Sequence, residues 1–326
     1  MITRRTLLAV PALLLIARPN AARALEGAVE RARGFEQLHS LIVQRRGARV
    51  VEEVVAGPGV ARPANVKSVS KTLVATLLGC AVDRGEVPGV GATLREVAPG
   101  LIPSGAEEGV GAITLEDLVT LRAGLERTSG ANYGAWVSSR NWVADALGRE
   151  MVAEPGGRML YSTGTTHVLG AVLAEVAGKS LLALMRERLG AVLGEVPAWT
   201  RDPQGRYLGG NEMAVSPDGL TRFGEMIRAG GVWEGERLVS SEWIEASFLP
   251  RTRSPWSGLG YGYGWFLGET EGMRYGLARG YGGQVLAVCP EAAVVVTITS
   301  DPSQPARSGG YFGELQALVE QVIASG

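Results

Sequence analysis

An uncharged run from Thr72 to Val82 predicts a helix that is buried on every side, because its apolar and small residues are not confined to one face. Lys71 stands at the start of this helix, and Ser68 lies three residues before it, so the two side chains share a helix face. Burying a lone lysine is costly unless the amine is paired or its pKa falls until it is neutral. A hydroxyl beside such an amine is a nucleophile beside a base. The alternative is that Ser68 caps the helix and Lys71 extends to solvent.

Strand-like runs gather at the two ends of the chain. Residues 38–44 and 49–55 flank the turn Arg46-Gly47 and predict a hairpin. Short runs separated by Gly- or Pro-containing turns predict further strands at residues 263–267, 273–279, 284–289 and 294–299. Helices are predicted at residues 25–33 and 311–324, and the second carries Leu315, Leu318, Val319 and Val322 on one face.

The middle of the chain, residues 84–250, alternates helical periods with Gly/Pro loops. Residues 113–121 predict one helix capped by Thr114, and another helix opens at Ser216 and runs to Arg228. This order predicts an α+β fold, an antiparallel sheet flanked by N- and C-terminal helices with a large helical insertion lobe. We expect a sheet lobe of residues 25–67 and 255–326, a helical lobe of residues 68–254, and a cleft between them.

Residues 1–24 have the pattern of an export signal. Arg4-Arg5 precedes an apolar stretch that ends at Ala17, and Ala22-Arg23-Ala24 supplies a small-x-small cleavage site. The apolar stretch is too short to span a bilayer. The paired arginines favour the twin-arginine route, with an ordinary secretory signal as the alternative. We therefore expect a bacterial protein that is periplasmic or secreted, begins near Leu25 and has no integral membrane span after signal removal.

Charge and cysteine content narrow the functional classes. The net charge is −1 and no basic stripe occurs, so nucleic acid is not expected as a partner. The two cysteines, Cys80 and Cys289, are too few for a disulfide scaffold. Both lie in apolar runs that favour buried free thiols, with a disulfide between them in an exported protein as the alternative. No Cys/His cluster has metal-ligand spacing, so no metal or cofactor is expected.

Other catalytic signatures find little support. The only two histidines, His39 and His167, lie in a strand-like and a helical apolar run, where a structural role is the simpler interpretation. No Gly-x-Ser-x-Gly sequence occurs. Gly178-Lys179-Ser180 resembles the end of a phosphate loop, but Leu173 stands where that motif needs glycine, and Gly178 more simply ends a helix.

Two later segments could serve Ser68. Tyr161 lies after Pro155-Gly156 and before a helix, where its hydroxyl can enter a cleft and a nearby cation would favour the phenolate. The run from Arg279 to Gln284 is rich in glycine, so its backbone at Gly280 and Tyr281 can approach a ligand and, with the N–H of Ser68, form an oxyanion hole. The alternatives are an ordinary half-buried tyrosine and a plain turn.

The order and spacing of these segments resemble the β-lactamase-related serine hydrolases, whose class C β-lactamase fold is shared with D,D-peptidases and many esterases. The resemblance rests on Ser68-Val69-Ser70-Lys71, on Tyr161-Ser162-Thr163 and on the glycine-rich strand before Gln284, and it covers nearly the whole mature chain. Residues 113–125, 230–243 and 261–265 are also similar to this family. The resemblance implies that Ser68 is acylated, that Lys71 is its base or proton relay, and that Tyr161 is the general acid/base.

Two departures bear on the substrate. Thr163 stands where class C β-lactamases carry Asn, so no side-chain amide is presented there. Ala278-Arg279 replace the Lys or His usual before the glycine, a form closer to the 6-aminohexanoate-dimer hydrolase and esterase branch, and Arg279 either supplies a positive charge or points away from the cleft. We expect hydrolysis of a small ester, amide or peptide. The alternatives are a β-lactamase or D,D-peptidase and a non-catalytic binding protein.

Specificity is expected to depend on aromatic residues of the helical insertion. The candidates are Tyr133, Trp136 and Trp142.

Overall fold

The structure, a computed structural model, describes residues 19–325 of the 326-residue chain. Residues 1–18 of the predicted export signal therefore lie outside the described residues, and residues 19–24 begin helix α1 (Pro19–Arg33). Within residues 19–325, no single helix has the length and apolar character needed to cross a membrane. The consecutive helices α7 (Thr163–Ala177) and α8 (Leu181–Leu193) meet that test only as a pair bent by 87°.

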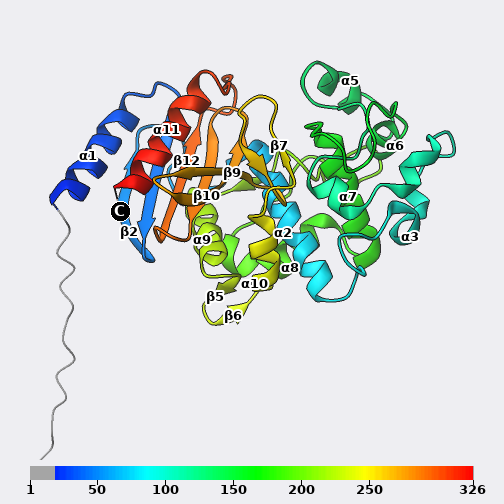
Figure 1. Cartoon of the computed structure of the whole chain (residues 1–326), viewed down its shortest axis with the longest axis horizontal. Coiled ribbons are helices and arrows are strands. Elements are labelled where there is room, and N and C mark those ends of the chain that lie inside the picture. The colour runs from blue at the N-terminus through cyan, green and yellow to red at the C-terminus, as the bar shows by residue number, and fades with distance from the viewer. Residues whose placement is uncertain (1–18, 326) are drawn as a thin grey trace, which may run out of the picture.

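One antiparallel sheet of eight strands unites the two ends of the chain, as predicted (Figure 1). Its order is β2-β1-β12-β11-β10-β9-β8-β7. The strands are β1 (Leu38–Arg45), β2 (Ala48–Val54), β7 (Thr252–Arg253), β8 (Gly260–Tyr261), β9 (Phe266–Thr270), β10 (Met273–Gly280), β11 (Gln284–Cys289) and β12 (Val294–Ser300). The first strand pairs with the last, and Leu41 lies opposite Ile298.

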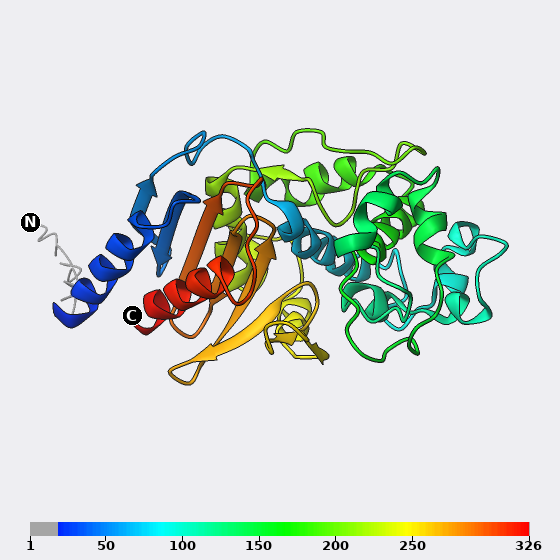
Figure 2. The same ribbon diagram turned by 90° about the horizontal axis from the view of Figure 1, so that it is seen from above.

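Helices cover both faces of this sheet. Helices α1 and α11 (Tyr311–Ala324) lie side by side over one face, and α9 (Pro217–Arg228) packs on the other (Figures 1 and 2). Because both faces are covered, every residue of β11 and β12 is buried, and these strands lack the polar alternation of a solvated sheet. The closing helix has the predicted bounds, and its four predicted core residues are all buried.

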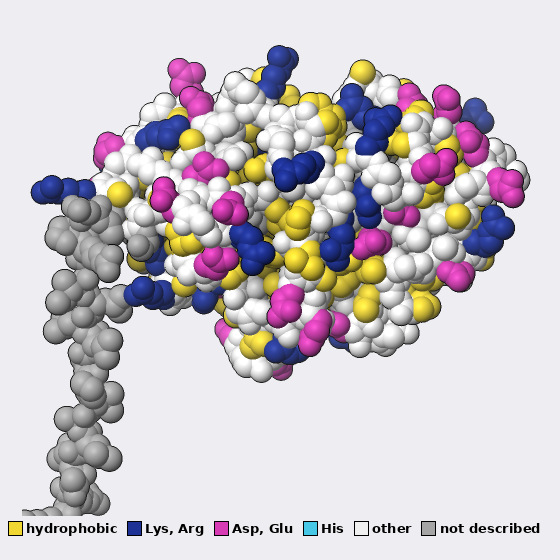
Figure 3. All heavy atoms as spheres, in the orientation of Figure 1, with side chains coloured by type: hydrophobic (Ala, Val, Ile, Leu, Met, Phe, Trp, Pro, Cys, Tyr) yellow, Lys and Arg dark blue, Asp and Glu magenta, His cyan; other side chains and the backbone are white. Residues whose placement is uncertain are grey.

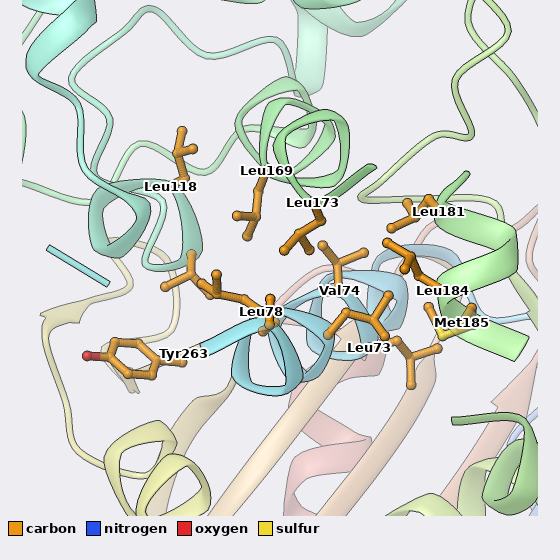
Figure 4. Packing of buried hydrophobic residues seen from close by; sticks show 14 of the residues in the cluster. Leu73, Val74, Leu78, Leu118, Leu169, Leu173, Leu181, Leu184, Met185 and Tyr263 are labelled. Atoms are coloured by element: carbon orange, nitrogen blue, oxygen red, sulfur yellow. The ribbon is translucent and has the colours of Figure 1, made fainter. Parts of the chain in front are cut away.

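Helix α2 (Ser70–Asp83) joins the sheet to the helical insertion and is buried along Ser70–Ala81, as its uncharged sequence predicts. Its leucines pack against leucines of α7 and α8 in one continuous core; Figure 4 shows Leu73, Val74 and Leu78 facing Leu169, Leu173 and Leu184. Packing on every side fixes the start of α2, and with it Ser68 and Lys71, relative to the sheet.

Short elements complete the fold. The helices are α3 (Leu94–Val97), α4 (Leu115–Val119), α5 (Tyr133–Val137), α6 (Trp142–Leu147) and α10 (Ser241–Ser247), with one-turn 3₁₀ helices η1 (Lys67–Val69), η2 (Pro99–Leu101), η3 (Glu108–Ala112) and η4 (Gly130–Asn132). Two small ladders pair β3 (Ala64–Asn65) with β4 (Ala214–Val215) and β5 (Val232–Trp233) with β6 (Glu236–Arg237). On the surface shown in Figure 3, acidic and basic side chains are interspersed, in keeping with the net charge of −1.

Three predicted elements differ from those observed. Helix α1 begins at Pro19, whereas the sequence predicts a helix from residue 25. Thr114 caps α4 through a reciprocal bond pattern with Asp117, but the helix ends at Val119, and Leu121 adopts a left-handed φ of 60°. The strand predicted at residues 263–267 begins at Phe266, because Gly264 forms a turn with a φ of 78°. A Cβ at Gly264 would lie 2.7 Å from the Cβ of Ala75, so the turn packs directly on α2.

Both cysteines are free and buried, as their apolar surroundings predict. Cys80 lies in α2 and Cys289 ends β11.

Candidate active site

Ser68 lies in the one-turn helix η1, immediately before α2. The Nζ atom of Lys71 is 3.1 Å from the Oγ atom of Ser68, which is hydrogen-bond distance. Lys67 holds a φ of 49°, an unusual conformation for a residue with a side chain. Its ammonium group pairs with Glu212 at 2.9 Å. The Ser68 hydroxyl and the Lys71 amine are therefore adjacent in the structure, as their sequence spacing predicts.

Lys71 is almost completely buried, with 3% of its surface exposed, and does not extend to solvent. Its Nζ atom lies 2.7 Å from the carbonyl oxygen of Gly210 and 3.3 Å from Oγ1 of Thr163. Among the described residues no carboxylate forms an ion pair with it. Burial disfavours the charged form and lowers the pKa of Lys71 to about 7. A neutral amine can donate to Gly210 and Thr163 and still offer a lone pair to the Ser68 proton.

Tyr161 covers the same amine from another side. The Nζ atom of Lys71 lies 4.9 Å from the centre of the Tyr161 ring, over its face. Burial raises the pKa of Tyr161, and the Ser68 hydroxyl and the Arg279 guanidinium only partly oppose this effect. A nearby cation was expected to favour the phenolate, but burial outweighs the charge of Arg279 and keeps the pKa of Tyr161 above its usual value, so Tyr161 keeps its proton at neutral pH.

Thr163 is the first residue of α7, and a neighbouring loop holds it in place. Its Oγ1 atom lies 3.0 Å from Oγ of Ser129, which also accepts the Thr163 N–H at 2.9 Å. Ser162 points the other way and accepts the backbone N–H of Thr128 at 3.1 Å. The loop at residues 128–129 thus positions this segment, a role that no local sequence signal identifies.

The glycine-rich segment predicted to serve Ser68 ends β10 directly beside η1. A Cβ atom at Gly280 would lie 2.3 Å from the carbonyl oxygen of Val66, so only glycine allows this approach. Gly280 and Tyr281 both line the cavity that contains Ser68, and half of the Tyr281 surface is exposed. The glycine-rich segment and the segment that carries Ser68 therefore form the same wall of the cavity.

Arg279 lines the same cavity rather than pointing away from it. Its guanidinium carbon lies 4.1 Å from the ring centre of Phe312 and 5.1 Å from that of Phe266, and Nη2 donates to Oγ of Ser308 at 3.0 Å. No carboxylate of residues 19–325 lies within ion-pair distance of Arg279. Two aromatic faces thus orient a cation whose charge is not neutralised.

The cavity has a volume of about 550 Å³ and combines apolar and cationic walls. Its aromatic lining consists of Tyr133, Tyr161, Trp256, Phe266, Tyr281 and Phe312. The Arg127 guanidinium lies over the exposed Trp256 ring at 5.5 Å, and Arg127 also forms no ion pair among the described residues. Trp256, Phe312 and Arg127 were not predicted as site residues; the one sequence signal for them is a tryptophan in an otherwise polar, Pro- and Gly-containing loop.

Of the three insertion aromatics expected to line the cavity, only Tyr133 does so. Trp136 and Trp142 are 0% and 6% exposed and pack their rings against His167, 5.8 and 5.7 Å away between ring centres. Their indole N–H groups are satisfied by backbone carbonyls, which lets both rings remain inside. The prediction for Trp136 and Trp142 is therefore wrong.

His167 is fully buried, and its Nε2 atom lies 3.2 Å from a carboxylate oxygen of Asp202. It makes no hydrogen bond with Ser68. Within the described part of the chain, no group of three or more His, Cys, Asp or Glu side chains could hold a metal ion. The groups available to activate Ser68 are thus the Lys71 amine and the Tyr161 phenol, not a histidine or a metal ion held by the described residues.

A family model named Beta-lactamase matches residues 39–320, and this span contains every residue of the site. The chain belongs to the beta-lactamase family. No curated protein shows a significant match to it.

Solved structures related to this beta-lactamase-family protein share its fold at low identity. A penicillin-binding protein homologue from Caulobacter crescentus is 18% identical, with 94% of this chain and 98% of that chain covered and a TM-score of 0.73. A family VIII carboxylesterase is 15% identical, with coverages of 94% and 98% and a TM-score of 0.71. A Bacillus anthracis protein assigned as a 6-aminohexanoate-dimer hydrolase is 17% identical, with coverages of 88% and 78% and a TM-score of 0.73.

Proposed function

We propose that this beta-lactamase-family protein is a serine hydrolase that cleaves an ester or amide through an acyl-enzyme on Ser68. One observation carries the proposal: a buried amine with a pKa of about 7 lies 3.1 Å from the Ser68 hydroxyl. An amine that is substantially neutral at pH 7 can accept the serine proton, whereas an ordinary lysine cannot.

The proposed chemistry has two halves. In acylation, Lys71 takes the Ser68 proton while Oγ bonds to the substrate carbonyl carbon. The resulting tetrahedral oxyanion accepts hydrogen bonds from the backbone N–H groups of Ser68 and Tyr281. Tyr161 gives its proton to the leaving alcohol or amine as the carbon–heteroatom bond breaks, and Lys71 returns a proton to Tyr161. In deacylation, the oxygen of a water molecule bonds to the acyl carbon while the same pair takes a proton from that water. The bond from the acyl carbon to Ser68 Oγ then breaks as the pair returns the proton to Oγ, which releases the acid and restores the serine.

An ester or linear amide is favoured over a β-lactam because Thr163 offers a hydroxyl, already bonded to Ser129 and Lys71, where an amide would be needed. The carboxylesterase among the similar structures supports the same choice. A β-lactamase or D,D-peptidase remains the second candidate on one observation: Arg279 brings an unneutralised cation into the cavity, where a substrate carboxylate could bind.

A substrate panel tests this function. Short-chain p-nitrophenyl esters, a linear amide, a D-amino peptide and a chromogenic cephalosporin are offered to wild-type protein and to Ser68→Ala. We expect ester turnover that is lost in Ser68→Ala. Faster turnover of the cephalosporin than of the esters would instead indicate a β-lactamase or D,D-peptidase. Binding without turnover of any compound would indicate a non-catalytic binding protein.

We also propose that residues 1–24 direct export and that the mature chain begins near Leu25. N-terminal sequencing of protein recovered from the periplasm of an expressing bacterium tests this proposal. An intact Met1 on cytoplasmic protein would contradict it.

A further inference from the structure

The acceptor that holds Lys71 belongs to a pair of glycines, Gly209 and Gly210, that lies against the first turns of α7. A Cβ at Gly209 would be 2.5 Å from the carbonyl oxygen of Thr166, and a Cβ at Gly210 would be 3.0 Å from the Cβ of Thr166. Both glycines are buried. Their close approach brings the Gly210 carbonyl oxygen within 2.7 Å of Lys71 Nζ. Any shift of this segment would therefore move a direct partner of the proposed base.

Besides Lys71, the His167 side chain hydrogen-bonds to this glycine pair. The backbone N–H of Gly209 donates to Nδ1 of His167 at 3.3 Å. The opposite ring nitrogen, Nε2, lies 3.2 Å from Oδ2 of Asp202. Because Nδ1 accepts a hydrogen bond, Nε2 must carry the proton of the neutral ring and donate a hydrogen bond to Asp202. The two contacts therefore require a single tautomer of the neutral imidazole.

Two aromatic rings and a hydrogen-bonded carboxylate surround the His167 ring. Trp136 and Trp142 pack against it with ring planes inclined at 67° and 65°. The other carboxylate oxygen of Asp202 accepts the backbone N–H groups of Gln204 and Arg206 at 2.9 and 2.8 Å. Burial raises the pKa of Asp202, but the bonds from His167 and Arg206 outweigh it and hold that pKa below its usual value. A fixed carboxylate thus orients a fixed ring.

From this geometry we propose that His167 is a positioning residue for Lys71. Its Nδ1 atom holds the Gly209 N–H and so fixes the Gly210 carbonyl that keeps the Lys71 amine beside Ser68. The inference rests on the proposed function, because it assigns His167 an effect on that same reaction. His167 makes no hydrogen bond with Ser68 and is not among the residues that line the cavity, so its side chain is linked to the site through the glycine pair.

Two substitutions separate the two ring nitrogens. His167→Asn places an amide oxygen near the position of Nδ1, so it can still accept the Gly209 N–H, but it loses the contact with Asp202. His167→Gln places an amide nitrogen near the position of Nε2, so it can still donate to Asp202, but it loses the acceptor for Gly209. His167→Leu removes both contacts and retains an apolar side chain.

Steady-state ester hydrolysis and thermal melting of the three variants provide the test. We expect His167→Asn to keep kcat within about threefold of wild type, and His167→Gln and His167→Leu to lose roughly tenfold or more in kcat with little change in KM, because a displaced base slows chemistry rather than binding. Melting should follow a different order, with His167→Gln the more stable of the two amide variants because Asp202 keeps its partner. A purely structural histidine would instead make activity follow stability, and that result would overturn the proposal.

Hydrogen exchange at the Gly209 amide supplies a readout that does not need catalysis. This amide should be protected in wild type and His167→Asn and exchange faster in His167→Gln. Equal protection in all variants would overturn the positioning role. Absence of ester turnover in the wild type would instead refute the proposed function, while the exchange data would still decide whether His167 holds the glycine pair.

Discussion

The Nζ atom of Lys71 lies 2.7 Å from the carbonyl oxygen of Gly210, although 139 residues separate them in the chain. A carbonyl oxygen accepts hydrogen bonds from a neutral amine as well as from an ammonium group, so it orients Lys71 without neutralising a charge. Burial can then depress the pKa of the lysine unopposed, since no carboxylate among the described residues forms an ion pair with it. A fixed amine with a pKa of about 7 is partly neutral near pH 7 and can therefore act as a general base.

Replacing Lys71 by arginine should abolish catalysis while retaining a cation. Arginine cannot release its proton near neutral pH, so we expect Lys71→Arg and Lys71→Ala each to lose roughly a hundredfold or more in turnover. Ester hydrolysis is measured beside a thermal melt that confirms folded protein. Lys179→Arg, at an exposed lysine, is the matched control and should keep wild-type activity. Near wild-type turnover by folded Lys71→Arg would show that Lys71 is not the base.

Activity should fall with acidification through the pKa of Lys71. Below pH about 7 this amine is increasingly protonated and cannot accept the Ser68 proton, so kcat/KM should rise from pH 5 to 8 with a midpoint near 7. Tyr161 does not oppose this rise, because its raised pKa keeps it protonated throughout this range. The pH profile of ester hydrolysis checks the expectation. A profile that stays flat from pH 5 to 8 would contradict a lysine base.

The stability of the folded protein should also depend on pH through the pKa of Lys71. The folded-state pKa of Lys71 is lowered by burial to about 7 from its usual value of 10.5, so between these values the unfolded chain binds more protons than the folded one. The destabilisation from Lys71 is therefore fully present below pH 7 and is relieved as the pH rises towards 10.5. We expect the Tm of wild type relative to Lys71→Met to increase from pH 7 to pH 10, with no such trend for Lys179→Met. A Tm difference that does not change with pH would place Lys71 in contact with water.

Arg279 should select substrates by charge. A guanidinium held between Phe266 and Phe312 without a carboxylate partner can bind an anionic group of the substrate. We expect Arg279→Gln to lower kcat/KM for the anionic ester p-nitrophenyl hemisuccinate by about tenfold or more, since a hydrogen bond to a charged group contributes about 1.5–3 kcal/mol. The kcat/KM for the neutral ester p-nitrophenyl butyrate should change little. Arg274→Gln, at an exposed arginine of the same strand, should leave both rates unchanged. Equal losses on the two esters would indicate a structural role for Arg279.

The sequence predicts the framework well because the framework follows from local patterns. The closing helix over residues 311–324, the hairpin at Arg46-Gly47 and the buried helix after Ser68 each follow from periodicity and turn residues within one segment. The Ser68–Lys71 contact is also local, since one helical turn places both side chains on the same side.

The residues that line the cavity cannot be predicted from local sequence patterns. Its aromatic walls come from a loop at Trp256, a strand at Phe266 and a helix at Phe312, and only the tertiary fold brings them together. The direction of Arg279 depends on the two rings that hold it, so the strand pattern leaves it open. Trp136 was expected in the cavity because the sequence does not reveal that its indole N–H finds the Trp142 carbonyl inside the fold.

Covalent labelling of Ser68 tests the central claim most directly. A fluorophosphonate reacts with an activated serine, and peptide mass spectrometry then locates the adduct and distinguishes Ser68 from Ser70 and Ser162, the other serines of its own segment and of the Tyr161 segment. Ser70 donates to the Lys67 carbonyl and Ser162 is bonded to Thr128, so neither is next to the Lys71 amine in the way that Ser68 is. The proposed mechanism predicts a single adduct on Ser68 that is lost in Ser68→Ala and slowed in Lys71→Arg. An adduct on Ser70 or Ser162 with Ser68 unmodified would contradict it.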